Sequence, residues 1–290
     1  MLIHVVEQGE TINSIAEKYN TSAQLIIYNN EIQNPNNLVV GQTIVILFPQ
    51  VIHTVEEGDT VNSIAAEYNV SVGDIIRNNP IILNTNVIYP GQSIVISYEG
   101  EKFGTIAVNG YCYPNIDRLV LRKTLPYLSF LTVFTYGFTE EGELVEINDS
   151  EVVEIAKSYN VAPIMLISSL SQSGTFSNEL SEALLNNEDA QDILIENILN
   201  NMRQKGYYGL DIDFEYVFPK DRQAYVDFIS KTQKRLSEEG FVVFVALAPK
   251  TSGDQPGLLY EAHDYEAIGQ VADAVFLMTY EWGYTYKYRR

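Results

Sequence analysis

Three carboxylates alternate with apolar residues in the segment GYYGLDIDFEYV, residues 206–217. Successive side chains of a β-strand point to opposite faces, so Asp211, Asp213 and Glu215 are expected to share one face. Burying like charges side by side costs several kcal/mol, which packing alone rarely justifies. Enzymes use neighbouring carboxylates to raise the pKa of one acid while another stays ionised. The spacing therefore predicts acid–base catalysis, and the competing interpretation is a solvated edge strand.

A strand that carries such acids must end at an open cleft. Gly209 precedes the alternating run and Phe218-Pro219 follows it, which fits a core strand ending in a loop at the mouth of a barrel. Glu215 is nearest the carboxyl end of this strand, where barrel enzymes place their chemistry. We expect the neighbouring carboxylates to raise the pKa of Glu215 so that it can act as an acid.

The residues after position 103 alternate between apolar runs and amphipathic helices, which is the signature of a βα architecture. The runs are apolar throughout, as expected of parallel strands covered by helices. They predict an α/β TIM barrel that is incomplete after about six strands, because an eight-stranded barrel needs roughly 100 further residues. The chain would then be a fragment of a longer protein or hold a degenerate barrel. Strands are predicted near 104–112, 129–136, 161–168, 208–214, 241–247 and 273–279, and helices most clearly over 150–159, 187–205 and 220–239.

The composition argues against several classes of function. The net charge of −20 leaves no basic stripe to neutralise phosphates, which argues against nucleic acid and against anionic membranes as partners. Cys112 is the only cysteine, so we expect no disulfide and interpret it as a small buried residue rather than a nucleophile. The three histidines form no cluster, so neither a metal nor any other cofactor is predicted.

The chain begins MLIHVVEQGE, without a basic n-region or a long apolar h-region. This start predicts synthesis in the cytoplasm without a signal peptide. No apolar run approaches the length needed to cross a bilayer, so no membrane partner is expected.

Residues 2–48 and 51–98 repeat one another with a period near 49. IHVVEQGETINSIAEKYN returns as IHTVEEGDTVNSIAAEYN, and VGQTIVI returns as PGQSIVI. Each repeat predicts a strand, two helices and a strand, with Thr11 or Thr60 as the cap of the first helix. We therefore expect two small α+β domains, a linker over 99–103, and a barrel domain over 104–290.

The repeats resemble a tandem pair of LysM domains through the Gly-Glu/Asp-Thr turn, the Ser-Ile-Ala helix, the Asn-Asn loop and the Gly-Gln-x-Ile strand. The resemblance implies binding to N-acetylglucosamine chains of peptidoglycan or chitin, along a groove between two loops of each repeat. In the competing interpretation, the threonines only cap helices and the asparagines only fill left-handed turns. Both repeats together are expected to bind more tightly than one. The loops are residues 8–13 and 32–41, then 57–62 and 81–90, and the candidate contacts are Gly9, Thr11, Asn30, Gly58, Thr60 and Asn79.

GLDIDFE resembles the DGxDxDxE signature of glycoside hydrolase family 18, and MTYEW at 278–282 resembles the Met-x-Tyr-Asp motif of that family. The resemblance implies a TIM barrel and substrate-assisted retaining hydrolysis, in which the 2-acetamido group of the sugar attacks its own anomeric carbon. Glu215 matches the general acid, Asp213 matches the residue that orients the acetamido group, and Asp211 lies behind it and can share its proton. Tyr280 matches the phenol that hydrogen-bonds the acetamido oxygen. Further substrate contacts are expected from Met278, Glu281 and Trp282.

Two positions depart from the pattern of that family. Tyr208 stands where the signature has its first aspartate, and Glu281 stands where the family has aspartate after Tyr280. The first position is farthest from Glu215. Replacing its aspartate should therefore adjust the properties of the catalytic acids more than it abolishes the reaction. The extra methylene of Glu281 puts rate or specificity in question. Tyr280 and Trp282 could also pack in the core rather than contact sugar.

Together, the repeats and the GLDIDFE, APKTS, EAHDY and MTYEW motifs are similar to LysM-bearing bacterial spore proteins, among them cortex-fragment-lytic N-acetylglucosaminidases. The leading hypothesis is a peptidoglycan glycosidase associated with the spore coat, the cortex or the cell wall. The second is a non-catalytic glycan-binding protein, which the missing strands favour and the intact carboxylates oppose. A chitinase acting on exogenous chitin is a third. The sequence does not choose among cortex, vegetative peptidoglycan and chitin.

Overall fold

The structure is a computed structural model, and it describes residues 1–80, 82, 87–100, 104–170 and 176–279. The chain divides into two compact units. The first consists of Met1–Ile106 with Leu119–Tyr127, and the second of Ala107–Arg118 with Leu128–Arg290. None of the helices in the described ranges combines the length and the apolar character that a bilayer crossing demands.

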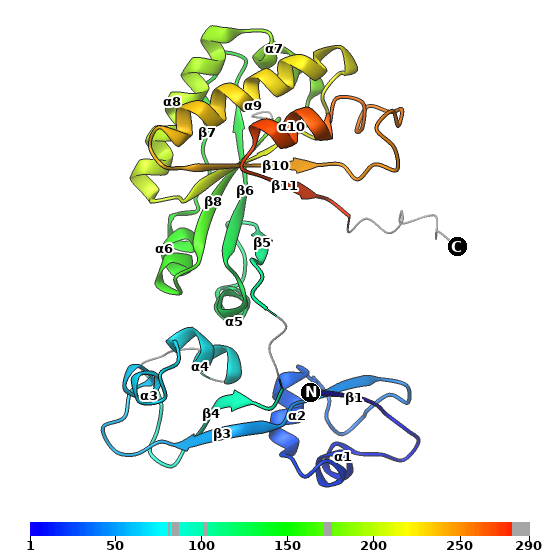
Figure 1. Ribbon diagram of the computed structural model, residues 1–290, viewed down its shortest axis with the longest axis vertical. Helices are drawn as coiled ribbons and strands as arrows, with labels where there is room; N and C mark the ends of the chain where they lie inside the picture. The colour runs from blue at the N-terminus through cyan, green and yellow to red at the C-terminus, as the bar shows by residue number, and fades with distance from the viewer. Residues whose placement is uncertain (81, 83–86, 101–103, 171–175, 280–290) are drawn as a thin grey trace. The chain divides into compact units, whose positions relative to one another are not determined.

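The first unit contains two copies of a β-α-α-β fold, as the repeats predict (Figure 1). Each copy pairs its first and last strands in an antiparallel two-stranded sheet. A short helix and a 3₁₀ turn, α5 (Arg118–Thr124) and η1 (Leu125–Tyr127), complete this unit. The first copy is β1 (Leu2–Val5), α1 (Ile12–Lys18), α2 (Ala23–Asn29) and β2 (Thr43–Ile46), and the second is β3 (Pro49–Thr54), α3 (Val61–Glu67), α4 (Val72–Asn78) and β4 (Ser93–Tyr98).

Each copy has its own small core of aliphatic side chains. Ile15 and Ile44 are fully buried in the first copy, and Ile64 and Ile94 occupy the same places in the second. These residues come from the helical positions that the spacing in the sequence predicts and from the closing strand. The duplicated sequence therefore folds into two separate cores rather than one shared core.

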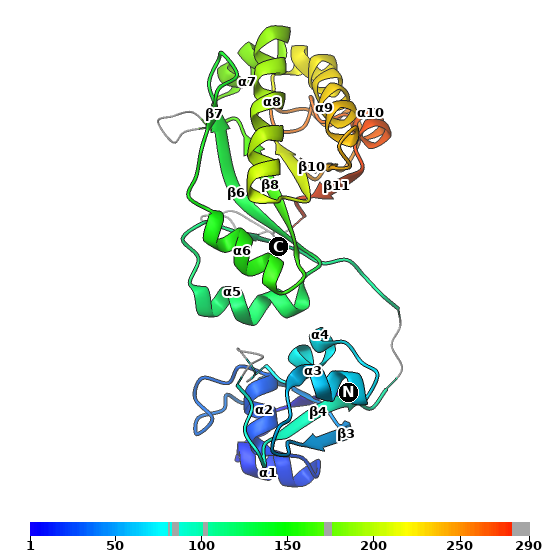
Figure 2. The same ribbon diagram turned by 90° about the vertical axis from the view of Figure 1, so that its left-hand side faces the viewer.

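The second unit is a parallel sheet with helices packed along its outer face (Figures 1 and 2). Its strands run in the spatial order β11-β10-β9-β8-β6-β5, and the short β7 pairs with β6 in the antiparallel sense. All six predicted strands are present, although the first begins at residue 109 rather than near 104. The strands are β5 (Asn109–Cys112), β6 (Phe130–Phe138), β7 (Leu144–Val145), β8 (Ala162–Ser168), β9 (Gly209–Asp213), β10 (Val242–Leu247) and β11 (Ala274–Leu277).

Amphipathic helices connect these parallel strands, as right-handed βα units require. Asn187 caps the longest helix by accepting a hydrogen bond from Ala190 N–H, and Gly206 ends it in the left-handed region at φ +75°. The three predicted helices are present, and the sequence reasoning missed α7 and α10, which have only eight and seven residues. The helices are α6 (Ser150–Ser158), α7 (Asn178–Leu185), α8 (Glu188–Lys205), α9 (Arg222–Ser237) and α10 (Tyr265–Val271), with the 3₁₀ turn η2 (Pro219–Asp221) before α9.

The sheet curls, so that side chains from its two outermost strands meet on the inner face. The ring of Tyr111 on β5 lies 6.2 Å from the ring of Phe276 on β11, although four other strands separate them in the sheet. Phe244 of β10 also packs edge-on against Phe276. The described residues therefore form a half-barrel with six parallel strands, where a closed TIM barrel has eight. The predicted fold class is confirmed in this form.

Candidate active site

The central strand β9 carries the predicted carboxylates in the interior of the half-barrel. It lies between β8 and β10, with Asp211 beside Leu166 on one neighbour and Phe244 on the other. Asp211 is 0% exposed and Asp213 is 4% exposed. A solvated edge strand is therefore excluded, because β9 is paired on both sides and its acids are buried.

A cavity of about 260 Å³ opens at the carboxyl end of β9. Asp213 lies on its wall together with the half-buried Glu215, while Asp211 is one strand repeat deeper and does not reach it. Aromatic side chains from β5, from the residue after it and from β6 form half of the remaining lining, which is the kind of surface that a sugar ring contacts. The lining consists of Tyr111, Cys112, Tyr113, Phe134, Asp213, Glu215, Ala246 and Met278.

Asp211 has one strong hydrogen bond in this interior. The phenol of Tyr111 donates to Asp211 Oδ2 over 2.7 Å. Asp211 Oδ1 has no hydrogen-bond partner among the described residues. Burial raises the pKa of Asp211 to about 7, while the Tyr111 bond opposes that rise. Asp211 is therefore poised to exchange a proton near neutral pH.

Asp213 is the acid whose ionisation costs most. Burial raises its pKa well above the usual value, and the neighbouring charges of Asp211 and Glu215 raise it further. Three like charges in one low-dielectric site cannot all be ionised at once. The three acids Asp211, Asp213 and Glu215, here called the carboxylate ladder, therefore hold at least one proton at neutral pH. This is the arrangement that acid–base chemistry needs. The predicted rise in the pKa of Glu215 itself stays a prediction.

The other predicted active-site residues are only partly within the described structure. Met278 lines the cavity, and its N–H donates to Leu247 O over 3.0 Å, which extends the line of β11 beside β10. Tyr280, Glu281 and Trp282 lie outside the described residues.

Two further predictions concern residues near the carboxylates. Tyr208 lies just before β9, is 46% exposed, and packs against the ring of Phe130 with centroids 5.8 Å apart. It is thus at the end of the strand away from Glu215, as expected. Cys112 is buried, and burial raises the pKa of its thiol to about 11. The thiol stays protonated at neutral pH, which fits the predicted packing role and not a nucleophile.

Tyr111 is the residue of this site that the sequence reasoning missed. It is one of 20 tyrosines, and its partner Asp211 lies 100 residues further along the chain. The usable signal was its position in a predicted strand, where alternation places its side chain on the opposite face of the sheet from that of its neighbour Cys112. That signal gives the face but not the partner.

In the first unit, the predicted glycan loops at 8–13 and 57–62 have the turns and caps that their sequences predict, whereas residues 81 and 83–86 of the predicted loop 81–90 lie outside the described residues. Gly9 and Gly58 adopt φ values of +88° and +94°, which L side chains rarely adopt. Thr11 and Thr60 each cap a helix, accepting a hydrogen bond from the N–H of the serine three residues later. The capping role given in the competing interpretation is therefore present, and it does not by itself exclude a sugar contact.

Asn30 and Asn79 use their side chains to hold a helix against the closing strand. The amide nitrogen of Asn79 donates to Ile75 O and Val95 O, and its oxygen accepts from Val95 N–H, all within 2.8 Å. Asn30 makes the equivalent bonds in the first copy, including two to Val45. Neither asparagine fills a left-handed turn, because their φ values are −114° and −133°. Asn20 and Asn69 occupy such turns instead.

The predicted glycan loops at 8–13 and 57–62 are each also held by a histidine that the sequence reasoning did not use. His4 is buried and contacts the Glu10 carboxylate through Nε2 at 2.8 Å and the Tyr19 hydroxyl through Nδ1 at 3.1 Å. Glu10 also accepts the N–H of Glu7 over 2.8 Å, which closes the turn. The recurrence of histidine at the same place in both repeats was the available signal. The equivalent residues in the second copy are His53, Asp59 and Tyr68, at 2.9 and 3.2 Å.

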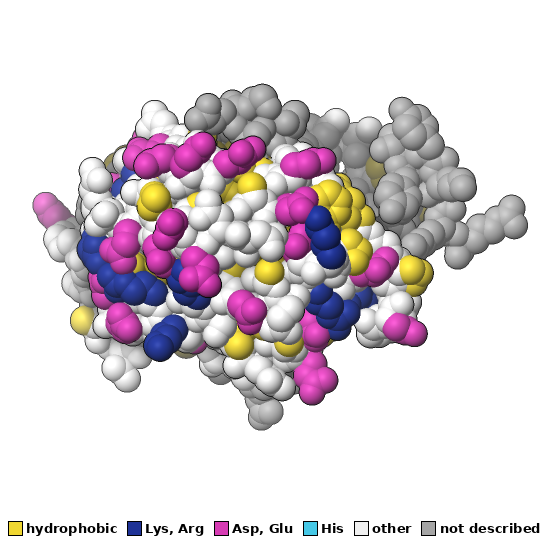
Figure 3. Space-filling model, turned by 90° about the horizontal axis from the view of Figure 1, so that it is seen from above, with side chains coloured by type: hydrophobic (Ala, Val, Ile, Leu, Met, Phe, Trp, Pro, Cys, Tyr) yellow, Lys and Arg dark blue, Asp and Glu magenta, His cyan; other side chains and the backbone are white. Residues whose placement is uncertain are grey.

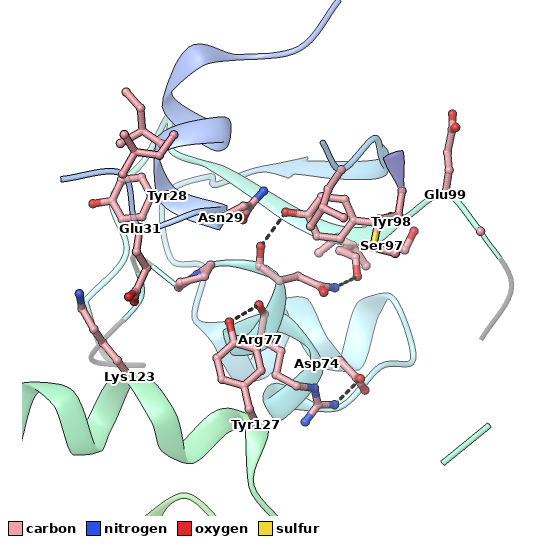
Figure 4. A pocket seen from close by; sticks show the side chains of 18 of the residues that line it. Tyr28, Asn29, Glu31, Asp74, Arg77, Ser97, Tyr98, Glu99, Lys123 and Tyr127 are labelled. Atoms are coloured by element: carbon pink, nitrogen blue, oxygen red, sulfur yellow. Dashed lines mark hydrogen bonds and ion pairs between the residues drawn. The ribbon is translucent and has the colours of Figure 1, made fainter. Parts of the chain in front are cut away.

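A larger cavity, of about 1230 Å³, lies in the first unit and borders the start of the predicted loop 32–41 (Figure 4). Two of its tyrosines already donate to main-chain oxygens, Tyr98 to Asn78 O over 3.1 Å and Tyr127 to Arg77 O over 3.2 Å. Among the described residues of the predicted glycan loops, only Ile32 and Gln33 contribute to its lining. This cavity is therefore a different surface from the predicted glycan groove.

Figure 3 shows one face of the molecule with its charged side chains coloured. Over the coloured part of the face in Figure 3, acidic and basic side chains are interspersed rather than gathered by sign. Across the described ranges, no three histidine, cysteine or acidic side chains converge as a metal site would require.

Comparison with known proteins places these features in a family. The description "Glycosyl hydrolases family 18" matches residues 106–287, and "LysM domain" matches residues 4–47 and 53–97. The cortical fragment-lytic enzyme of Bacillus subtilis (strain 168) is 43% identical over 291 residues, which cover 98% of this chain and 67% of that protein. The cortical fragment-lytic enzyme of Bacillus anthracis is 37% identical over 297 residues, covering 97% and 66%.

A solved structure agrees with these matches. The spore cortex-lytic enzyme SleL of Bacillus megaterium QM B1551 superposes with a TM-score of 0.75 at 35% identity, covering 97% of this chain and 66% of that one. The chain thus spans about two thirds of the length of the relatives it matches. Since the family description covers more than half of the chain, the resemblance predicted from the motifs is confirmed. The chain belongs to glycosyl hydrolases family 18 and carries two LysM domains ahead of its family 18 domain.

Proposed function

We propose that this chain is a glycosidase of spore-cortex peptidoglycan, which hydrolyses bonds at N-acetylglucosamine by substrate-assisted retaining catalysis. One observation carries the proposal: Asp213 and Glu215 line one cavity at the carboxyl end of β9, with Asp211 buried behind them. Carboxylates at this edge of a parallel barrel are positioned for chemistry, whereas a binding site needs no such buried ladder.

Glu215 is the general acid and base of the proposed reaction. It follows β9 directly, is half-buried, and lies on the cavity wall, so its carboxyl can reach a glycosidic oxygen. The carboxyl of Glu215 gives its proton to that oxygen as the acetamido oxygen of the sugar bonds to the anomeric carbon. Glu215 then takes a proton from water as the water attacks the anomeric carbon and opens the oxazolinium ring.

Asp213 and Asp211 together stabilise the positive charge that develops on the acetamido group. The nitrogen of that group becomes positive in the oxazolinium intermediate, and a carboxylate from Asp213 stabilises it. The raised pKa of Asp213 means that its proton must leave at this stage. Asp211, with a pKa of about 7, is the acid beneath it that can take this proton. Tyr280 completes the proposed set through the acetamido oxygen, on the family resemblance alone.

The two LysM domains are proposed to bind the glycan through the loops at 8–13 and 57–62 with their partner loops. The turns at Gly9 and Gly58 present main-chain amides, and the hydroxyls of Thr11 and Thr60 lie beside them. We assign Asn30 and Asn79 to holding a helix against the closing strand of each copy rather than to glycan contact, because their side chains are used by main-chain groups.

The names of the relatives favour spore cortex over vegetative peptidoglycan or chitin as the glycan. Two related proteins are called cortical fragment-lytic enzymes and a related structure a spore cortex-lytic enzyme. We therefore propose association with the spore cortex for this chain as well.

A non-catalytic glycan-binding role is the second candidate, and one observation favours it. The outermost strand β11 pairs with β10 along one edge, and no strand among the described residues pairs with its other edge, so one wall of the half-barrel is open there. A cleft with an open wall admits water and can bind a glycan without holding it for reaction.

Digestion of cortex fragments and N-acetylglucosamine oligomers, with products read by mass spectrometry, distinguishes the two candidates. The chain is expected to release products with N-acetylglucosamine ends, and Glu215→Gln is expected to lower the rate by about 100-fold or more, because the amide has no proton to give. Glu146→Gln serves as the matched control, since Glu146 is exposed in the same unit. Cleavage by Glu215→Gln at the unmodified rate would contradict the assignment, and intact glycan binding without any products would favour the second candidate.

A further inference from the structure

Two motifs near the cavity have no place in the mechanism above. APKTS, residues 248–252, follows β10 directly, and EAHDY, residues 261–265, leads into α10. They are separated by a loop in the sequence, yet their side chains and main chains are bonded to each other. The contacts centre on one buried histidine, His263, which is 1% exposed.

His263 bridges the ends of β9 and β10. Its Nδ1 accepts the N–H of Ala248 over 3.0 Å, and its Nε2 lies 3.1 Å from the carbonyl oxygen of Phe214. A main-chain N–H can only donate and a carbonyl can only accept, so the ring must be neutral with its proton on Nε2. The β9–β10 ladder itself stops at the pair Ile212 and Val245. The ring therefore continues the link between the two strands past their last main-chain bonds.

The surroundings hold His263 in this position. The Tyr265 hydroxyl donates to Ala248 O over 2.5 Å and accepts Lys250 N–H over 3.0 Å. It thus pairs with the main chain after β10 as the main chain of a neighbouring strand would. From α9, the guanidinium of Arg222 donates to Glu261 O and to the Asp264 carboxylate, at 3.0 and 2.8 Å.

Phe214 is the residue immediately before the proposed catalytic acid, and it is fixed from two sides. Its ring is fully buried and stacks against Tyr225 and Phe228 of α9, with its centroid 5.7 Å from that of each. Its carbonyl is held by His263. The peptide that leads into Glu215 thus has one hydrogen bond and one packed side chain that set its orientation.

We propose that His263 is a positioning residue for the reaction, which orients Glu215 by holding the Phe214 carbonyl against the end of β10. This inference rests on the proposed function of Glu215. Misplacing a reacting group by about 1 Å costs roughly 100-fold in rate. Loss of the bridge should therefore lower kcat and leave KM nearly unchanged, because the cavity wall that contacts sugar is otherwise intact.

Three variants of the full chain test this role by steady-state cleavage of cortex fragments. His263→Phe fills the site without either hydrogen bond and is expected to lower kcat about 10- to 100-fold, with KM within about twofold. His263→Gln retains a donor and an acceptor and is expected to recover most of that loss. Glu266→Gln, at an exposed residue three positions later, is the matched control and should be unchanged. Equal kcat for His263→Phe and the unmodified chain would overturn the proposal, as would a KM that rises as much as kcat falls.

A milder variant and a spectroscopic measurement cover the case in which His263→Phe does not fold. Tyr265→Phe removes only the hydroxyl that braces Ala248 and Lys250, and it should lower kcat several-fold at an unchanged KM. Nitrogen-15 NMR of the His263 ring should show a neutral ring protonated at Nε2 in the unmodified chain. Any other tautomer, or an unchanged kcat in Tyr265→Phe, contradicts the brace. If the unmodified chain cleaves no glycan, the proposed function fails, while the tautomer still tests the bridge.

Discussion

Replacing Asp211 by asparagine should remove a large electrostatic cost from the folded half-barrel. Burial raises the pKa of Asp211 from its usual 3.8 to about 7. Each pKa unit corresponds to about 1.4 kcal/mol, so ionising Asp211 in the folded state costs about 4 kcal/mol more than in the unfolded chain. Asparagine has the same shape, stays neutral and can still accept the Tyr111 hydroxyl. The change therefore isolates the charge.

The sign of this effect follows from proton binding. Between pH 3.8 and about 7 the folded Asp211 keeps a proton that the unfolded chain has lost. The contribution of Asp211 to the free energy of unfolding is then largest below pH 3.8. It falls as the pH rises towards 7, by about 1.4 kcal/mol per pH unit for each such group. Asp213 behaves in the same way, so the two acids give a slope of about 2.7 kcal/mol per pH unit near pH 5.5. Asp211→Asn should reduce this slope by about half.

Hydrogen exchange read by mass spectrometry measures the opening free energy of β9 in the full chain. Asp211→Asn should be more stable than the unmodified chain by up to about 4 kcal/mol at pH 8, while its glycan cleavage should be slower. Asp227→Asn is the control, since Asp227 is exposed on α9. Between pH 5 and 6.5 the folded Asp211 mostly keeps its proton, so its charge acts little on Asp213 and the difference between the two slopes reports mainly Asp211. Equal slopes from pH 5 to 6.5 would refute the reasoning.

Four further substitutions test three separate sets of hydrogen bonds. Tyr111→Phe removes a hydrogen bond that lowers the pKa of Asp211, so the midpoint of Asp211 titration, followed by carboxyl infrared absorption, should rise by about 1–2 pH units; an unmoved or lower midpoint would contradict the bond. Asn79→Ala leaves buried main-chain groups of β4 unpaired and should destabilise the second LysM domain by about 2–4 kcal/mol in hydrogen exchange, and a loss under about 0.5 would show that the bonds are unimportant. Thr60→Ala and Ser63→Ala each break the same capping box at a cost of about 1 kcal/mol. If Thr60 also contacts glycan, only Thr60→Ala should lower retention on insoluble peptidoglycan, and equal retention counts against that contact.

The strands and the carboxylate ladder could be predicted because their information is local. The apolar runs that become β8 and β10 identify themselves by composition, and alternation along GLDIDFE gives the face of each acid. The short helices α7 and α10 were missed because two turns carry too little apolar periodicity to register. Their N-caps, Ser177 and Asp264, were present in the sequence but are common residue types.

The supporting bonds could not be predicted because they join residues far apart in the chain. Asn30 was expected at the glycan, but its side chain reaches Val45, 15 residues away, to hold a helix on a strand. His263 meets Phe214 across 49 residues, and no local pattern encodes that meeting. Sequence periodicity thus reports which face a residue takes, while the identity of its partner depends on how the sheet curls.

The bond between Tyr111 and Asp211 also bears on the order in which the molecule assembles. It joins positions 100 residues apart, and it forms only once the sheet has curled far enough to bring β5 towards β9. Closing so long a loop costs more chain entropy than pairing residues that are closer in the sequence. Strands that are neighbours in the sequence therefore pair first. A refolding chain therefore regains its helices and strands before Tyr111 reaches Asp211, and the proposed active site is the last part of the half-barrel to form.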